Sequence, residues 1–310
     1  MSSLQKYFLS PHVPNTAAGF VDDNFAVIEL RRGRGGFAPA SSAITQLEPE
    51  LIYPSFDTPN IQREEELAEI IVQTVEAAGL AKKKRWSVAL PDATSRTLVL
   101  TLESKPSSRR ELNEVIAWKV ERFVPSPSSE LRISKQRISP VAGQDRYLVT
   151  VAHDEVISQY ESLFFSIGWE AGMILPRHIG EAQWLIWDSS PGDKLLVSAN
   201  RSGFTSVIVR NGEPVLIRNH QCEPAAMTDE LHRFALYYRD RLAGGAASAL
   251  TRMLVLGDID AIEAREAIYE ATDTAPHVIE PAEMGFNLKG EAIRFDHIAG
   301  PAGLATIAWQ

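Results

Sequence analysis

The stretch Lys194–Gln221, KLLVSANRSGFTSVIVRNGEPVLIRNHQ, predicts three consecutive β-strands, and the interpretation of the whole chain starts from it. Between the second and third strands lies Asn211-Gly212, the dipeptide that best tolerates the positive φ angles of a type I′ hairpin turn. The first two strands are joined by Asn200-Arg201-Ser202-Gly203, which is also typical of a turn. The pattern therefore predicts an antiparallel meander, which on these residues alone can be purely structural. The expected strands are Leu195–Ser198, Thr205–Arg210 and Pro214–Arg218.

Composition limits the classes of protein to which the chain can belong. Its 310 residues are 45% hydrophobic and 23% charged, as is ordinary for a globular protein with a sizeable core. The net charge of −9 argues against a general nucleic-acid binder, because such proteins need a basic face. A single cysteine, Cys222, excludes an internal disulfide and a CxxC metal site. With no signal-peptide pattern at Met1–Pro14 and no run of about 20 apolar residues, we expect a soluble, intracellular protein.

The N-terminal part predicts strands followed by a helix. The first strand is expected at Asn24–Leu30, after the polar segment Met1–Gly19, and Phe37–Tyr53 is expected to add one or two more. The basic turn between them, RRGRGG, is interpreted as solvated, because its spacing fits no phosphate-binding loop. Ile61–Ala78 carries apolar residues at helical spacing and acidic residues near its start, so we expect a helix there.

A compact α+β module is expected over Thr97–Leu175. Ser108 begins a capping-box pattern, which predicts a helix that continues through Phe123 with Ile116 and Phe123 among its inward residues. Short strands and a second helix alternate with it, in an order that many small α+β domains share. The expected elements are strands at Thr97–Leu102, Leu131–Ile138, Arg146–His153 and Glu170–Leu175, and a helix at Glu155–Ile167.

The remaining elements alternate in the same way around the central meander. Asp260 is positioned to cap the helix that follows it. The expected helices are His178–Trp187, Thr228–Arg241, Ala261–Thr272 and Gly300–Trp309, and the expected strands are Met253–Leu256 and Val278–Ile279.

Two stretches resemble the type IV pilus assembly protein PilM and its relatives FtsA and the cytoplasmic domain of GspL. One is the strand–turn–strand–NGE–strand rhythm of the central meander, and the other is SRTLVLTL…ELNEVIAWKVERFVP, starting at Ser95. The resemblance implies an α/β, actin-like (ribonuclease H-like) fold of two lobes. It places the first lobe at residues 1–95 and 176–190, an inserted α+β subdomain at 96–175, and a second lobe without most of a fourth subdomain at 191–310.

The resemblance also implies where a nucleotide would bind. It places the site on Ser198, Asn200, Gly203 and Thr205, with Gly257 and Asp258 on the adenosine side. The family's Asp-x-Gly turn is lost there, and its first phosphate loop aligns with Gly19, Val21 and Ala26, which lack the acidic residue that organises Mg²⁺. We therefore expect ATP or ADP to bind weakly or not at all, with no catalytic residues and no ATPase activity. The seven histidines show no metal-ligand spacing, so no metal site is expected.

The function implied by the resemblance is that of a cytoplasmic scaffold, peripheral to the inner membrane, in a type IV pilus or related secretion platform. It would bind the cytoplasmic tail of a bitopic, PilN-like protein, couple it to a motor ATPase and self-associate. The tail groove is expected on Thr97, Val99, Ile116, Trp118 and Phe123. Trp118 lies off the apolar stripe of its helix, so it is either an exposed anchor or packed against a neighbouring subdomain. The alternatives are a GspL-like domain of a type II secretion system and an active actin-like ATPase.

Overall fold

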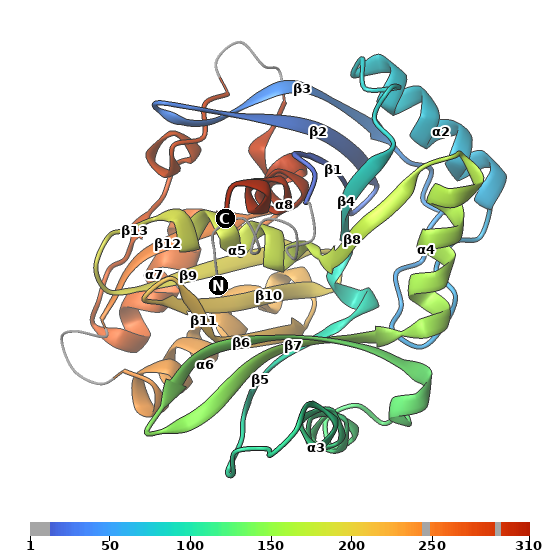
Figure 1. The fold of residues 1–310 in the computed structure, drawn as a ribbon. Coiled ribbons are helices and arrows are strands. Elements are labelled where there is room, and N and C mark those ends of the chain that lie inside the picture. Colours follow the sequence, from blue (N-terminus) through green and yellow to red (C-terminus); the bar gives the residue numbers. More distant parts are fainter. Residues whose placement is uncertain (1–12, 244–248, 289–292) are drawn as a thin grey trace.

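The computed structural model describes residues 13–243, 249–288 and 293–310, which form two five-stranded sheets, a three-stranded sheet and the helices around them (Figure 1). None of the helices in these ranges is long and apolar enough to span a bilayer. Residues 1–12, within the polar segment Met1–Gly19, lie outside the described residues.

The first sheet has the strand order β3-β2-β1-β4-β8. The first three strands form antiparallel hairpins, and β4 and β8 run parallel to β1. The expectation that the first strand begins at Asn24 is wrong, since β1 precedes it. Every residue of β1 is buried. Its sequence therefore lacks the alternation of polar and apolar residues that would have revealed a strand. The strands are β1 (Thr16–Val21), β2 (Asn24–Gly33), β3 (Gly36–Gln46), β4 (Arg85–Leu90) and β8 (Glu170–Pro176).

The second sheet contains the predicted meander and has the order β11-β10-β9-β12-β13. Asn211 and Gly212 adopt φ angles of 52° and 76°, which confirms the left-handed two-residue turn between β10 and β11. The edge strand β11 is followed after a few residues by the next helix. The strands are β9 (Asp193–Asn200), β10 (Gly203–Arg210), β11 (Glu213–Gln221), β12 (Leu250–Leu256) and β13 (His277–Val278).

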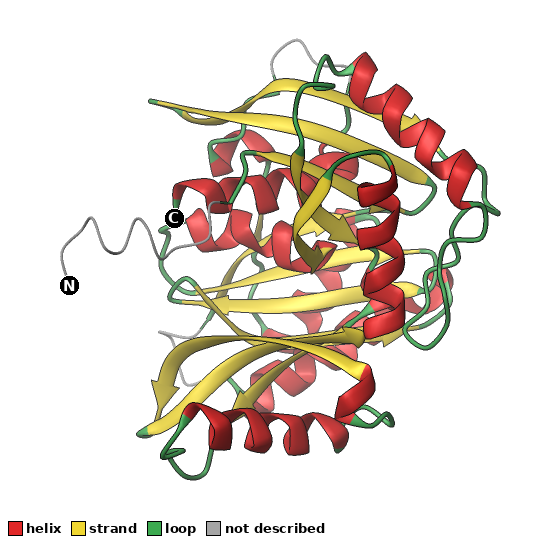
Figure 2. Ribbon diagram, turned by 45° about the vertical axis from the view of Figure 1, so that its right-hand side comes forward, coloured by secondary structure: helices red, strands yellow, loops and turns green. Residues whose placement is uncertain are grey.

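Helices alternate with the two sheets in layers (Figures 1 and 2). The outer face of the first sheet is covered by α2 (Glu64–Ala77) and α4 (Asp154–Ser166). A central pair, α5 (Arg177–Trp187) and α8 (Phe295–Thr306), separates the two sheets. The far face of the second sheet packs on α6 (Met227–Arg241) and α7 (Ala261–Thr272).

The central helix pair is held by aromatic packing and by glycines. Trp184 is fully buried, and its indole nitrogen donates to the carbonyl of Ala299 at 2.9 Å. Where the helices cross, a Cβ atom added to Gly303 would lie 1.8 Å from the carbonyl oxygen of Gly180. The two backbones therefore approach as closely as they do because neither position carries a side chain.

A third unit, which we call the inserted module, is built on the sheet β5-β7-β6 and has its own apolar core. Its helix α3 packs on one face, turned away from the rest of the molecule in Figure 1. Ser108 caps this helix as expected, its side chain accepting from the backbone of Glu111. The elements are β5 (Arg96–Thr101), α3 (Arg109–Glu121), β6 (Leu131–Val141) and β7 (Gln144–His153).

Three expectations about these units are wrong. The inserted module ends near His153, not at residue 175, because β8 pairs with β4 and α4 packs on the first sheet. The last helix, which begins at Phe295 rather than at Gly300, packs on β1, β2 and β4, so residues 191–310 are not all second lobe. Phe123 lies beyond the end of α3 and is 65% exposed rather than buried.

Candidate functional site

A cavity of about 580 Å³ opens where the first lobe, the inserted module and the second lobe meet. The first lobe contributes the β1–β2 turn, the loop between β3 and α2, and the residues after β4. The module contributes Arg96 at the start of β5. The second lobe contributes the β9–β10 turn and two residues of β11, Asn219 and Gln221. The β9–β10 turn, where the resemblance places phosphate-binding residues, thus lines the same cavity as the β1–β2 turn.

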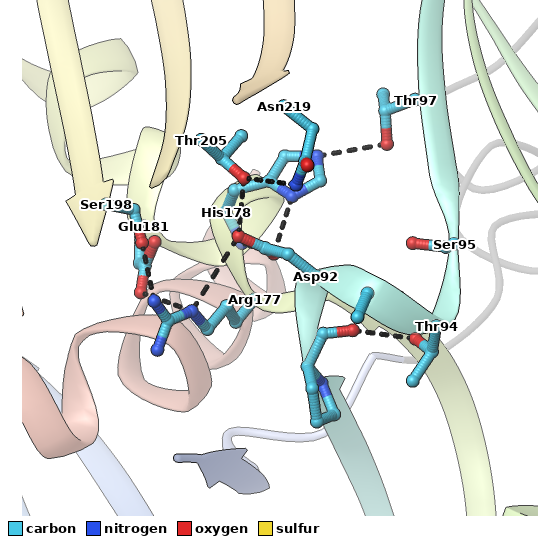
Figure 3. Close-up of polar contacts among 12 residues, drawn as sticks. Asp92, Thr94, Ser95, Thr97, Arg177, His178, Glu181, Ser198, Thr205 and Asn219 are labelled. Atoms are coloured by element: carbon cyan, nitrogen blue, oxygen red, sulfur yellow. Dashed lines mark hydrogen bonds and ion pairs between the residues drawn. The ribbon is translucent and has the colours of Figure 1, made fainter. Parts of the chain in front are cut away.

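Asp92 is the centre of a buried polar network at the inner end of this cavity (Figure 3). It follows β4 and accepts at Oδ1 from the backbone nitrogen of His178, in the first turn of α5, at 3.2 Å. The same oxygen is 2.7 Å from Nδ1 of His178. The other carboxylate oxygen accepts from the hydroxyl of Thr205, on β10, at 2.8 Å. A carboxylate of the first lobe therefore binds the N-terminus of α5 and a strand of the second lobe.

His178 extends the network to the module. Its Nε2 lies 3.0 Å from the hydroxyl of Thr97 on β5, and both side chains are buried. Asn219 donates to the hydroxyl of Thr205 at 3.2 Å, which brings in the edge strand β11. The network thus ties together all three units of the molecule.

Arg177 supplies the balancing positive charge. It is 3% exposed. Its Nε lies 3.8 Å from a carboxylate oxygen of Asp92 and 3.7 Å from one of Glu181, which is four residues further along α5. One terminal nitrogen donates to the hydroxyl of Ser198 at 3.1 Å. One carboxylate oxygen of Glu181 is buried without a hydrogen-bond partner.

The buried charges shift one another's protonation. Burial disfavours the ionised Asp92, but the charge and hydrogen bond of His178, with Arg177 and Thr205, outweigh it and hold the pKa of Asp92 well below its usual range. Burial raises the pKa of Glu181 to about 6, although Arg177 opposes the rise. Burial also acts against the charge of Arg177, but Glu181 and Asp92 more than compensate, so the pKa of Arg177 is raised. The two buried carboxylates and the guanidinium at the centre of the molecule are therefore partners of one another.

The expected nucleotide residues are largely brought together, but their polar groups are already in use. Ser198 and Thr205 are paired across β9 and β10, and so are Asn200 and Gly203. The side chain of Asn200 accepts from the backbone of Ser202 at 2.9 Å, within the turn. Gly257 packs so closely on β9 that an added Cβ would lie 2.4 Å from the carbonyl oxygen of Ala199, and Asp258 beside it is exposed. The hydroxyls of Ser198 and Thr205 are hydrogen-bonded to Arg177 and Asp92.

The three positions aligned with the first phosphate loop lie inside the sheet core. Gly19 touches the ring of Pro301 on α8, and Val21 and Ala26 are buried. The turn beyond them is acidic, and its Asp23 forms an ion pair with Arg201 of the β9–β10 turn. This pair joins the tips of the two turns at the cavity.

The expected tail groove is not assembled. Thr97 and Val99 are on the face of β5 opposite α3, since Leu98 and Leu100 belong to the module core under that helix. Ile116 is buried in the same core. Trp118 is 55% exposed, with Arg122 over its ring at 5.0 Å, so it does not pack against a neighbouring subdomain. None of these five residues lines the cavity of about 580 Å³.

The sequence reasoning missed most of the network. Asp92, Arg177, His178 and Glu181 are far apart from Thr205 and Ser198 in the chain, and none stands in a recognised motif. The detectable signal was the placement of charged residues directly after strands, at LPD and LPRH, where strand ends meet at a sheet edge. Among the described residues, no group of three or more His, Cys, Asp or Glu side chains is arranged to hold a metal ion.

Comparison with known proteins places this geometry in a fold class. No family model and no curated protein matches the chain. A chain of the PilM-PilN type IV pilus biogenesis complex matches with a TM-score of 0.77, at 15% identity, over 97% of this chain and 100% of that one. A Bacteroides thetaiotaomicron protein of unknown function with an actin-like ATPase fold matches with a TM-score of 0.51, at 9% identity, over 96% and 98%. The chain therefore has an actin-like fold, arranged as in the PilM-PilN structure.

Proposed function

We propose that the protein is a cytoplasmic scaffold of an inner-membrane assembly platform, in a type IV pilus or related secretion machine. Its cavity would bind the cytoplasmic tail of a bitopic, PilN-like membrane protein rather than a nucleotide. The observation that carries the proposal is a full-length likeness to a chain of a PilM-PilN complex, combined with a cleft that the chain's own charges already bridge. Coupling to a motor ATPase and self-association belong to the same proposal.

The network supports the absence of ATP turnover. Phosphoryl transfer needs a carboxylate free to hold Mg²⁺ and backbone groups open to the phosphates. The only carboxylate deep in the cavity wall, within the described residues, is Asp92, which is bound to His178 and Thr205. Asp23, on the β1–β2 turn, is paired with Arg201. The two acidic residues are therefore already engaged with the protein's own side chains.

The shape and lining of the cavity support a peptide ligand. One wall, from the loop between β3 and α2, is apolar and contains Pro49, Ile52 and Tyr53. The lining also includes the amide side chains of Asn200, Asn219 and Gln221; the side-chain oxygen of Asn200 and the side-chain nitrogen of Asn219 already have partners, and their other amide groups can hydrogen-bond a peptide backbone. An extended segment that combines apolar side chains with backbone polar groups matches this mixed lining.

The experiment is fluorescence polarisation with a labelled peptide from the N-terminal cytoplasmic tail of a PilN-like membrane protein of the same organism. Tyr53 is 54% exposed at the cavity, so Tyr53→Ala should weaken binding about tenfold or more, as expected of an anchor aromatic. Trp118→Ala is the matched control, because Trp118 is equally exposed but lies outside the cavity. Failure of the wild-type protein to bind the peptide would contradict the proposed function. Loss of binding in Trp118→Ala but not in Tyr53→Ala would move the peptide site to α3.

A further inference from the structure

Arg96 is a charged side chain held at the junction of two cavities. It lines the cavity described above and also an adjoining one of about 480 Å³ between β5 and β11. Its guanidinium carbon lies 4.7 Å from the centre of the Phe56 ring, a cation–π contact. One terminal nitrogen donates to the carbonyl oxygens of Ser95 at 2.9 Å and Ala93 at 3.3 Å. These contacts fix the guanidinium while its other nitrogens remain available.

The other two arginines of the cavity differ from Arg96 in one respect. Arg177 faces Asp92 and Glu181, and Arg201 is paired with Asp23. Within the described part of the chain, Arg96 forms no ion pair at all, although it is half-buried. Burial lowers the pKa of Arg96, and Asp57 only opposes this from a distance. A partly desolvated cation without a counter-charge is costly, and an incoming anion would offset that cost.

The surroundings of Arg96 favour a single carboxylate over a polyphosphate. Asp22 and Asp57 stand exposed on the cavity rim and repel a highly charged anion more strongly than a singly charged one. The apolar and amide walls fit peptide groups on either side of the charge. A guanidinium that is fixed in orientation binds a planar carboxylate through two parallel hydrogen bonds.

We infer that the peptide bound in this cavity presents an acidic side chain to Arg96. The ion pair between them makes the protein select tails that carry this acidic residue. The inference rests on the proposed function and names the chemistry that the tail must carry. A tail without an acidic residue would lose the contact, and a lysine at the same place would be repelled.

The test is a double-mutant cycle by fluorescence polarisation. The probes are the labelled tail peptide and versions in which each Asp or Glu is replaced, one at a time, by Asn or Gln. Arg96→Gln should weaken binding of the original tail peptide at least about tenfold, and one of the peptide replacements should weaken binding to the wild-type protein by the same factor. That peptide replacement should not weaken binding to Arg96→Gln any further, because the two changes remove the same ion pair. Arg96→Lys, which keeps the charge without the fork, should bind with intermediate affinity.

Arg122→Gln is the matched control, since Arg122 also lies over an aromatic ring but at the C-terminal cap of α3, outside the cavity lining. It should bind the tail as the wild type does. Equal binding by wild type and a folded Arg96→Gln would overturn the inference and leave the proposed function standing. The wild-type protein offers a second test. If it bound every peptide with one Asp or Glu replaced as tightly as the original tail, the inference would be overturned and the proposed function would stand. Failure of the wild type to bind any tail peptide would overturn both.

Discussion

At the scale of single residues, Asp92 has the largest role that the structure reveals. It is a buried carboxylate that accepts hydrogen bonds from α5 and from β10, and it faces Arg177. A buried ion network adds little over an apolar core, but removing one partner leaves the others desolvated and unpaired. Replacing Asp92 should therefore cost much more stability than the intact network adds over an apolar core.

Replacing Asp92 should be strongly destabilising. In Asp92→Ala the charge of Arg177 keeps only Glu181 as a partner, and the backbone nitrogen of His178 and the hydroxyl of Thr205 lose their acceptor, so the free energy of unfolding should fall by about 3–5 kcal/mol. Urea denaturation measures this loss. Asp240→Ala removes an ion pair with Arg239 in which both side chains are exposed, and it should cost less than about 1 kcal/mol. An Asp92→Ala protein as stable as Asp240→Ala would show that the network does not stabilise the fold.

Glu181 gives the protein a specific pH dependence. Burial raises its pKa to about 6, above the ordinary value of 4.5, so the folded state binds this proton more tightly than the unfolded chain. Stability therefore decreases as the pH rises from about 4.5 to about 6, by about 2 kcal/mol in total. Glu181→Gln should remove this decrease, which urea denaturation at several pH values detects. An unchanged slope in Glu181→Gln would assign the pH dependence to another group.

At the scale of elements, the sequence predicted most helices and strands because local patterns determined them. The Asn211-Gly212 turn, the Ser108 cap and the Asp260 cap, which accepts from the backbone of Ile262 and Glu263, all occur as expected. The strand β1 was missed because burial on both faces removes alternation. The module boundary was wrong because a strand's sheet partner is a long-range property, and β8 pairs with β4 across the whole inserted module.

The crossing of α5 and α8 provides a test at this scale. A methyl group on Gly303 would overlap the backbone of Gly180, so Gly303→Ala must push the central helices apart. We expect a loss of about 3 kcal/mol in the free energy of unfolding, at the upper end of overpacking effects. Gly35→Ala, at a position with no neighbouring atom within 4 Å, should be within about 0.5 kcal/mol of wild type. Equal midpoints in thermal unfolding would show that the helices are not tightly packed there.

At the scale of the whole molecule, the two-lobed fold was predictable and the site was only partly so. The order of strands and turns in the central meander, and the stretch from Ser95, resemble the PilM family closely enough to imply the actin-like arrangement. Of the residues linked to nucleotide binding, Asn200 lines the cavity, whereas Gly19, Val21 and Ala26 do not. The contacts that close the cleft join residues 86 to 178 positions apart, such as Asp92 with His178 and Asp23 with Arg201, and no local pattern encodes them. The five residues expected to form the tail groove lie on different faces of the module, because the sequence could not show which side of β5 meets the helix α3.

We propose that this cleft is bridged by the protein's own side chains and does not serve a nucleotide. The decisive experiment is isothermal titration calorimetry of the purified protein with Mg-ATP. Losing the charged partners of a phosphate costs about 2–5 kcal/mol, which weakens a dissociation constant of a few micromolar by about 30- to 5,000-fold. We therefore expect Mg-ATP to bind with a dissociation constant of about 0.1 mM or weaker. A saturating isotherm with a dissociation constant of a few micromolar would show that the cleft is a nucleotide site.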